Sequence, residues 1–225
     1  GNNSTNVITG VGFESDFTWF KIRGSAASHA LFDSIRGVNL GLSTNQTASE
    51  YTAAADKDLV SWDSDGFTLG PKEDWGSVND NNGSIVAWNW DMGGTTASNT
   101  NGTITSSVRA NTTYGQSIVS YSGTGSAATV GHGLASAPTM IIVKNRNSTT
   151  HWSVYHSSLG NTKFIDLNQT NASDTSTSVW NDTTPTSSVF SIGTNSRVTG
   201  SGNALIAYCF SDVTGYSKFG SYSGN

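Results

Sequence analysis

Short runs of alternating apolar and polar residues are the most regular pattern in this chain of 225 residues. Residues 152–156, Trp-Ser-Val-Tyr-His, are one such run. Because side chains on a strand point alternately to its two faces, this alternation predicts a β-strand with two different faces. Residues 85–90 and 204–210 are instead apolar or aromatic at almost every position, which predicts strands with both faces covered.

These runs occur twice, roughly 120 residues apart, and self-similarity at a fixed spacing is typical of repeated architecture. Three pairs of segments carry the similarity: 17–23 with 140–146, 66–70 with 189–193, and 83–90 with 202–210. The sequence therefore predicts two tandem units of one kind.

A shorter similarity links the end of the chain to its middle. The sequence Ser-Tyr-Ser-Gly at 120–123, which leads into the second copy, returns at 221–224. The first residues, 1–5, match residues 123–127, just beyond that motif. The two ends fit each other head to tail, so we expect the chain to be a segment of a longer array or the mature part of a larger product. The alternative is an ordinary boundary of the sequence.

Composition indicates the fold class. Only 12% of the residues are charged, and Ser, Thr and Asn supply most of the polarity. Ser and Asn favour turns and compete with helix hydrogen bonds, while Thr also fits strands. We therefore expect an all-β protein of two similar antiparallel β-sandwich units, jelly-roll-like, over 1–92 and 116–225. Residues 93–115, rich in Gly, Ser, Thr and Asn, are predicted to form a linker or a projecting hairpin. Residues 47–60 could support a short helix.

Charge and apolar content exclude several classes of partner. The net charge of −5 and the scattered positions of the 11 Lys and Arg residues argue against nucleic acid, whose binding requires a cationic surface. The apolar runs are far shorter than the ~20 residues that span a bilayer, so no membrane insertion is expected. The single cysteine, Cys209, cannot form an intrachain disulfide and is predicted to be a small buried apolar side chain.

Carboxylates cluster in the first copy. Asp63, Asp65 and Asp80 lie in oxygen-rich loops of the kind that calcium prefers, although the full calcium-loop pattern is missing. Solvated turn residues are the favoured interpretation, and catalytic acids the least favoured. No Gly-x-Ser-x-Gly elbow marks a nucleophile. We expect no cofactor, with calcium as the alternative, and no enzymatic activity.

Aromatic residues in polar surroundings are candidates for binding. Trp rings flanked by Asn and Asp can stack on sugar faces while amides and carboxylates bond to the hydroxyls. Core packing is the commoner role of Trp. The candidate residues for contact with a glycan or another partner are Trp62, Trp75, Trp180, Asp63, Asp65 and Asp74.

Several longer motifs resemble a domain found in tail-fibre-like and other structural proteins of marine bacteriophages, including those that infect cyanobacteria. The resemblance spans nearly the whole chain. It implies a non-enzymatic, multimeric component at the virion surface, and it supplies no catalytic residues. The motifs are residues 16–23, 31–37, 64–70, 131–138, 154–160, 185–193 and 215–220.

Two functions follow as hypotheses. The first is a tail-fibre or adhesion module, extracellular on the virion, whose loops contact host surface polysaccharide. The alternative is a capsid decoration or fibre-shaft protein that only contacts other subunits. Both predict other virion subunits as partners and a homo-oligomer.

Overall fold

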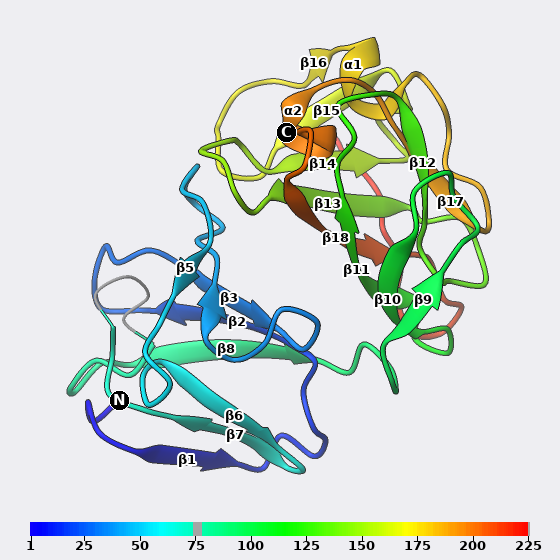
Figure 1. Ribbon diagram of the computed structural model, residues 1–225. Coiled ribbons are helices and arrows are strands. Elements are labelled where there is room, and N and C mark those ends of the chain that lie inside the picture. The colour runs from blue at the N-terminus through cyan, green and yellow to red at the C-terminus, as the bar shows by residue number, and fades with distance from the viewer. Residues whose placement is uncertain (74–77, 225) are drawn as a thin grey trace. The chain divides into compact units, whose positions relative to one another are not determined.

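The structure, a computed structural model, describes residues 1–73 and 78–224 and consists of two compact units (Figure 1). Unit 1 is Gly1–Asp91 and unit 2 is Met92–Asn225. The sheets of both units are built from antiparallel strand pairs, which confirms the all-β prediction. The predicted end of the first unit at residue 92 lies one residue beyond the observed boundary.

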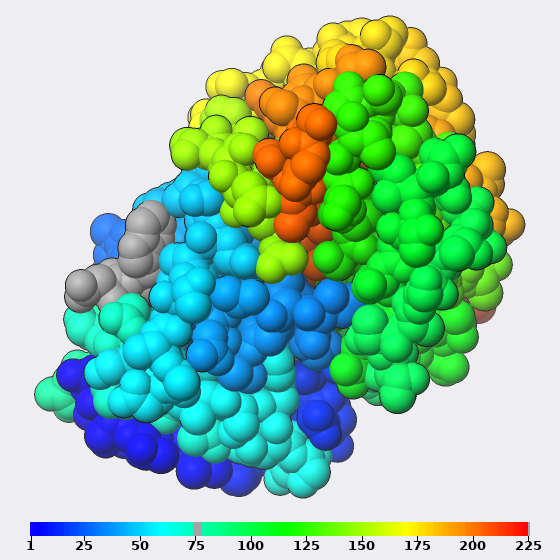
Figure 2. Space-filling model, in the orientation of Figure 1, coloured from blue at the N-terminus to red at the C-terminus, as the bar shows by residue number. Residues whose placement is uncertain are grey.

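Unit 1 contains two three-stranded sheets and a short strand pair. The strand orders are β1–β7–β6 and β3–β2–β8, and β4 pairs with β5. The strands are β1 (Asn6–Thr9), β2 (Phe17–Ile22), β3 (Ala30–Asp33), β4 (Leu40–Gly41), β5 (Tyr51–Thr52), β6 (Leu59–Asp63), β7 (Gly66–Leu69) and β8 (Ile85–Trp90). Figure 2 shows the N-terminal residues, in deep blue, at the surface, as expected for an edge strand.

The core of unit 1 lies between its two three-stranded sheets. Phe20 and Phe32 from one sheet and Leu59, Phe67 and Leu69 from the other belong to one cluster of buried residues. The rings of Phe20 and Phe67 meet edge to face, with centroids 5.3 Å apart. Burial of apolar side chains from two facing sheets is the arrangement of a sandwich, and it stabilises the fold by roughly 25 cal/mol per Å² of apolar surface.

Unit 2 contains a larger sheet of eight strands, in the order β16–β15–β14–β13–β18–β11–β10–β9, and a separate β12–β17 pair. Its helices α1 and α2 have four residues each, and within the described residues no helix is long and apolar enough to cross a membrane. The elements are β9 (Ala97–Asn99), β10 (Ser106–Asn111), β11 (Gln116–Ser122), β12 (Ala128–Gly131), β13 (Met140–Asn145), β14 (Ser153–His156), β15 (Lys163–Asp166), β16 (Asp174–Thr175), α1 (Thr177–Trp180), β17 (Val189–Ile192), α2 (Ser196–Thr199) and β18 (Ala204–Phe210).

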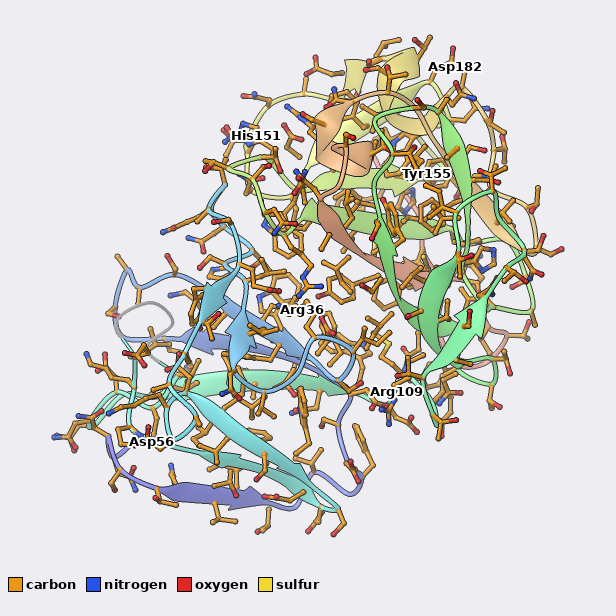
Figure 3. The ribbon with its side chains drawn as sticks, viewed as in Figure 1. Arg36, Asp56, Arg109, His151, Tyr155 and Asp182 are labelled. Carbon is orange, nitrogen blue, oxygen red and sulfur yellow. The ribbon has the colours of Figure 1, made fainter. Side chains whose placement is uncertain are left out.

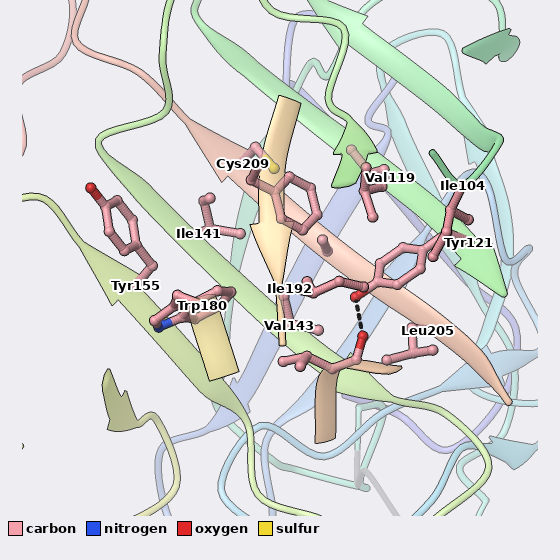
Figure 4. Packing of buried hydrophobic residues seen from close by; sticks show 14 of the residues in the cluster. Ile104, Val119, Tyr121, Ile141, Val143, Tyr155, Trp180, Ile192, Leu205 and Cys209 are labelled. Carbon is pink, nitrogen blue, oxygen red and sulfur yellow. Dashed lines mark hydrogen bonds between the residues drawn. The ribbon is translucent and has the colours of Figure 1, made fainter. Parts of the chain in front are cut away.

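The core of unit 2 draws on the large sheet, the β12–β17 pair and both helices (Figure 4). Tyr121 of β11 projects into this core, where its ring lies 6.2 Å from that of Phe190 and its hydroxyl donates to the carbonyl of Val198. Cys209 is a free, buried cysteine in the same cluster, which confirms its predicted role. Burial raises the pKa of its thiol, so the thiolate that reacts in redox chemistry is disfavoured.

The prediction of a linker at 93–115 is wrong. Strand β10 pairs with β11 over six residues and with β9 over three, so this segment extends the sheet of unit 2. A hairpin does form around Asn101 and Gly102, but Ile104 beyond it is buried and bridges to Val130 of β12. Because this part of the sheet presents one apolar face with few large side chains, its composition resembles that of a loop.

The two units share strand pairs in corresponding registers. Phe17 of β2 is opposite Trp90 of β8, and Met140 of β13 is opposite Phe210 of β18. These residues are the ones that the sequence similarity aligns. The β1–β7 and β12–β17 pairs correspond in the same way. The two units therefore have these strand pairs and their registers in common.

A lysine holds the same loop in each unit. The ammonium of Lys21 donates to the carbonyls of Ser25 and Ala27, and that of Lys144 donates to the carbonyls of Ser148 and Thr150. The similarity thus extends from the strands to a polar contact in which an ammonium bonds to carbonyls of the following loop. Burial lowers the pKa of Lys144 to about 8.

Candidate functional site

Trp180 is not available for glycan contact. Its side chain is 1% exposed, in the core cluster of unit 2, at the end of α1. Its ring meets that of Tyr155 edge to face, with centroids 5.9 Å apart (Figure 4). The prediction that Trp180 contacts a partner is therefore wrong, because α1 turns the residue inward although polar residues flank it in the sequence.

Trp62 also has a structural role. It is partly buried and packs against the core cluster of unit 1. Its indole N–H donates to the hydroxyl of Thr18, 3.1 Å away, so the polar end of the ring already has a partner. Trp75 and Asp74, the other residues of this prediction, lie outside the described residues.

Asp63 and Asp65 hold the β6–β7 hairpin and a neighbouring loop. One carboxylate oxygen of Asp63 accepts from the hydroxyl of Thr68, at 2.8 Å. Asp65, at the hairpin tip, accepts from the backbone N–H groups of Gly10 and Gly12, at 3.1 and 2.7 Å. Both glycines have positive φ angles of 88°, which let the loop turn its N–H groups toward the carboxylate. The geometry supports the interpretation as turn residues.

Asp80, the third calcium candidate, pairs with another side chain. Its carboxylate lies 2.6 Å from the ammonium of Lys72, and both side chains are partly exposed. Among the described residues, no group of three or more His, Cys, Asp or Glu side chains is arranged to hold a metal ion. The three aspartates thus have three separate sets of partners.

We expect calcium to leave the stability of the chain unchanged. Because the oxygens of Asp63 and Asp65 accept hydrogen bonds from protein groups, an ion would have to displace those donors. A ligand that binds only the folded state raises the melting temperature by mass action, and here we expect a shift below about 1 °C in millimolar calcium. Differential scanning calorimetry with calcium and with EDTA measures this, with magnesium as the control. A calcium-specific rise of several degrees would contradict it.

Asp58 and Tyr51 form a hydrogen-bonded pair of titratable groups in unit 1. The hydroxyl of Tyr51 donates to Asp58, 3.1 Å away, and the other oxygen of Asp58 accepts the backbone N–H of Glu73 at 2.9 Å. Burial raises the pKa of Asp58 and, with the nearby Asp58 charge, that of Tyr51. These contacts connect β5 to the loop before β6 and to the loop after β7. The pair therefore has a structural role, because it holds these three segments together.

A cavity of about 310 Å³ opens between the two three-stranded sheets of unit 1. It is mainly apolar, and it lies beside β8 and β1, the strands at one edge of each sheet. Three asparagines, Asn6, Asn79 and Asn89, add polar groups to its wall. The full lining is Gly1, Asn6, Ile8, Val11, Phe20, Phe67, Leu69, Val78, Asn79, Ile85, Ala87 and Asn89.

The polar groups of the cavity are mostly engaged. Asn79 is fully buried, and its amide donates to the carbonyls of Ser4 and Gly70 at 2.6 and 2.8 Å. The side-chain oxygen of Asn89 accepts from the hydroxyl of Thr18 at 3.1 Å. An apolar space whose polar groups already have partners suits apolar side chains better than a charged small molecule.

No local motif marks this cavity in the sequence. Its walls come from β1, β2, β7, β8 and a loop. The local sequence around each wall residue predicts only an ordinary core position.

Comparison with known proteins identifies a family. No curated protein and no solved structure matches the chain. The family model that matches is described as a domain of unknown function, DUF7483, and the match covers residues 1–225, both units included. The chain therefore belongs to the DUF7483 family.

Proposed function

We propose that this chain is a non-enzymatic structural module of a bacteriophage particle whose function is to contact other subunits. Its place in a phage particle rests on the sequence resemblance. The contact role rests on one observation, namely that the two units share their backbone framework but not their side-chain chemistry.

The hairpin that carries Asp65 illustrates this difference. In unit 1 the backbone N–H of Val11 donates to the carbonyl of Asp65, at 3.2 Å. In unit 2 the N–H of His132 donates to the carbonyl of Ser188, at 3.3 Å. The backbone contact is the same, while the carboxylate has become a hydroxyl. The framework occurs twice, but only unit 1 has the carboxylate. A framework that keeps its backbone contacts without this acidic group suits a packing role and argues against paired catalytic acids.

Adhesion to a host surface glycan has less support. It relied on Trp62, Trp75 and Trp180 as stacking platforms. Trp62 is bonded to Thr18 and Trp180 is in the core, while Trp75 lies outside the described residues. The subunit-contacting role is therefore the better candidate.

Size-exclusion chromatography with light scattering tests the proposal. We expect the 225-residue chain to form dimers or larger assemblies as its concentration rises from about 1 to several hundred µM, the range over which weak protein contacts saturate. A glycan array probed with the same sample is the control for adhesion. A chain that stays monomeric throughout would contradict the proposal, and strong, selective glycan binding would favour the alternative.

A further inference from the structure

His132 differs from the other histidines of the chain in its burial. It is 0% exposed, whereas His29, His151 and His156 are half-buried. It follows Gly131, the last residue of β12, in a loop of unit 2. Because the ring is removed from water, its protonation state depends on the protein groups that contact it.

Both ring nitrogens of His132 have hydrogen-bond partners, and these partners fix its tautomer. Nδ1 lies 3.1 Å from the backbone nitrogen of Leu134. A backbone N–H can only donate, so Nδ1 accepts and carries no proton. Nε2 lies 3.1 Å from the carbonyl oxygen of Thr186, which can only accept, so Nε2 carries the proton. The buried ring is therefore a neutral imidazole whose donor and acceptor are both satisfied.

The ring joins two segments of unit 2. His132 follows β12, and Thr186 lies in the turn that precedes β17. Inside that turn, the backbone N–H of Thr186 donates to the carbonyl of Val189, at 2.9 Å. Val189 is opposite Gly131 in the β12–β17 pair. The ring therefore holds the turn at 186–189 against the end of β12.

This end of the β12–β17 pair covers part of the core of unit 2. Phe190, the next residue of β17, is opposite Val130 of β12, and both belong to the core cluster and are fully buried. Loss of the contact between His132 and Thr186 therefore loosens a turn that lies directly beside a core aromatic residue.

The segments around His132 offer no counter-charge for a protonated ring. These segments are residues 130–134, the turn at 186–189, and β10, which bonds to the end of β12 through a hydroxyl group at 2.8 Å. The only Asp, Glu, Lys or Arg in their sequences is Arg109 of β10. Its guanidinium donates to a backbone carbonyl at 2.7 Å, and side chains alternate along a strand, so it lies on the face opposite to the core residue Val108.

A protonated ring does not fit these contacts. A second proton on the imidazole would lie on Nδ1 and face the N–H of Leu134, so that two donors would meet. Burial lowers the pKa of His132, and the hydrogen bond to the Thr186 carbonyl opposes this effect only in part. The closed contact therefore has its full stability above the ordinary histidine pKa of 6.5 and loses stability as the pH falls below that value.

Unit 1 builds the corresponding contact without a titratable ring. Val11 takes the place of His132, and its N–H donates to the carbonyl of Asp65 as that of His132 donates to the carbonyl of Ser188. The side chain of Val11 packs against the core cluster of unit 1. The backbone framework therefore does not require an imidazole at this position, and valine is a replacement that the framework accepts.

We infer that His132 is a pH-sensitive switch of unit 2: the neutral ring holds the turn at 186–189 against β12, and uptake of a proton by the ring opens this contact. In the open state water stabilises the protonated ring, so acid shifts the population toward that state. Unit 1 has no such response at the position of Val11. The inference goes beyond the subunit-contacting function, because it describes how unit 2 itself responds to acid.

Hydrogen exchange of the full-length chain at pH 7.5 and pH 5.0 tests the switch, in peptides that cover 128–136 and 185–190. After correction for intrinsic exchange rates, we expect the open population to rise by about 10- to 30-fold in acid, where about 30-fold is the limit for a ring that titrates near 6.5 only when exposed. The matched control is His132→Val, for which we expect a change below about threefold. Each chain is compared with itself, so a constant cost of the lost hydrogen bonds cancels. Equal pH dependence in the two chains overturns the inference.

Long-range ¹H–¹⁵N correlation spectra of the wild-type chain give a measurement that needs no variant. We expect the ring of His132, assigned by its contact with the Leu134 amide, to be the neutral Nε2–H form at pH 7.5. At pH 5.0 we expect the protonated ring only in the open population. A ring that takes up its proton near pH 6.5 while the turn at 186–189 keeps its protection from exchange overturns the inference. A neutral ring with its proton on Nδ1 overturns it as well, because the Leu134 N–H would then lack its acceptor.

Discussion

Replacing Trp180 by alanine is expected to lower the free energy of unfolding of unit 2 by about 3–5 kcal/mol. The side chain is 1% exposed and is among the largest fully buried side chains in the described structure. Its removal leaves a cavity against Tyr155 that the surrounding sheet and helix can only partly fill. Urea denaturation followed by hydrogen exchange and mass spectrometry measures this, because peptides of unit 2 report its unfolding separately.

Trp180→Phe is the matched control. The indole N–H of Trp180 has no hydrogen-bond acceptor among the described residues, so phenylalanine removes a buried unsatisfied donor and keeps most of the apolar volume. We expect its cost to be about 1 kcal/mol or less, since volume-conserving changes in a core are tolerated. A small effect of Trp180→Ala on stability, together with a loss of binding to any glycan, would return Trp180 to the role that its sequence context predicted.

The sequence predicted those parts of the fold that have strong local patterns. The runs at 85–90 and 204–210 form strands β8 and β18, because almost every residue in them is apolar or aromatic. The prediction that both faces are covered is confirmed for β18 and wrong for β8, whose residues are only partly buried and whose Trp88 is 46% exposed. Residues 47–60 lacked such a pattern, and the helix considered there does not form. Asp58 within that segment has a positive φ of 49°, which a right-handed helix excludes.

The candidate site was less predictable, because burial depends on distant residues. Trp180 follows a polar stretch, yet α1 and β14 bring it next to Tyr155 (Figure 4). The cavity of unit 1 combines residues from four strands, and no local motif relates them. Comparison of the two copies was more informative than any single motif.

The largest effect expected in unit 1 comes from Asp33. Its carboxylate pairs with the guanidinium of Arg36 (labelled in Figure 3), and neither side chain is exposed. Arg36 also donates to the carbonyls of Leu31 and Leu40 and to Glu50. Asp33→Ala leaves this guanidinium buried without its closest counter-charge. We expect a loss of about 3–5 kcal/mol in the free energy of unfolding of unit 1, measured by the same hydrogen-exchange method.

Unit 2 supplies the control for this prediction, because it builds the same turn without an ion pair. His156 and Leu159 take the places of Asp33 and Arg36, and the backbone bond from Gly160 to His156 matches that from Gly37 to Asp33. The ring of His156 also accepts the N–H of Ser158, as Asp33 accepts that of Ile35.

The double variant Asp33→His with Arg36→Leu therefore keeps the turn and removes both charges. We expect it to cost about 1–3 kcal/mol, less than Asp33→Ala alone, because a pair removed together leaves no isolated charge at this position. The remaining cost reflects Glu50 and the two carbonyls that lose a donor. If the double variant instead costs as much as the two single changes added together, Asp33 and Arg36 stabilise unit 1 independently, and the turn in unit 1 depends on contacts that unit 2 does not share.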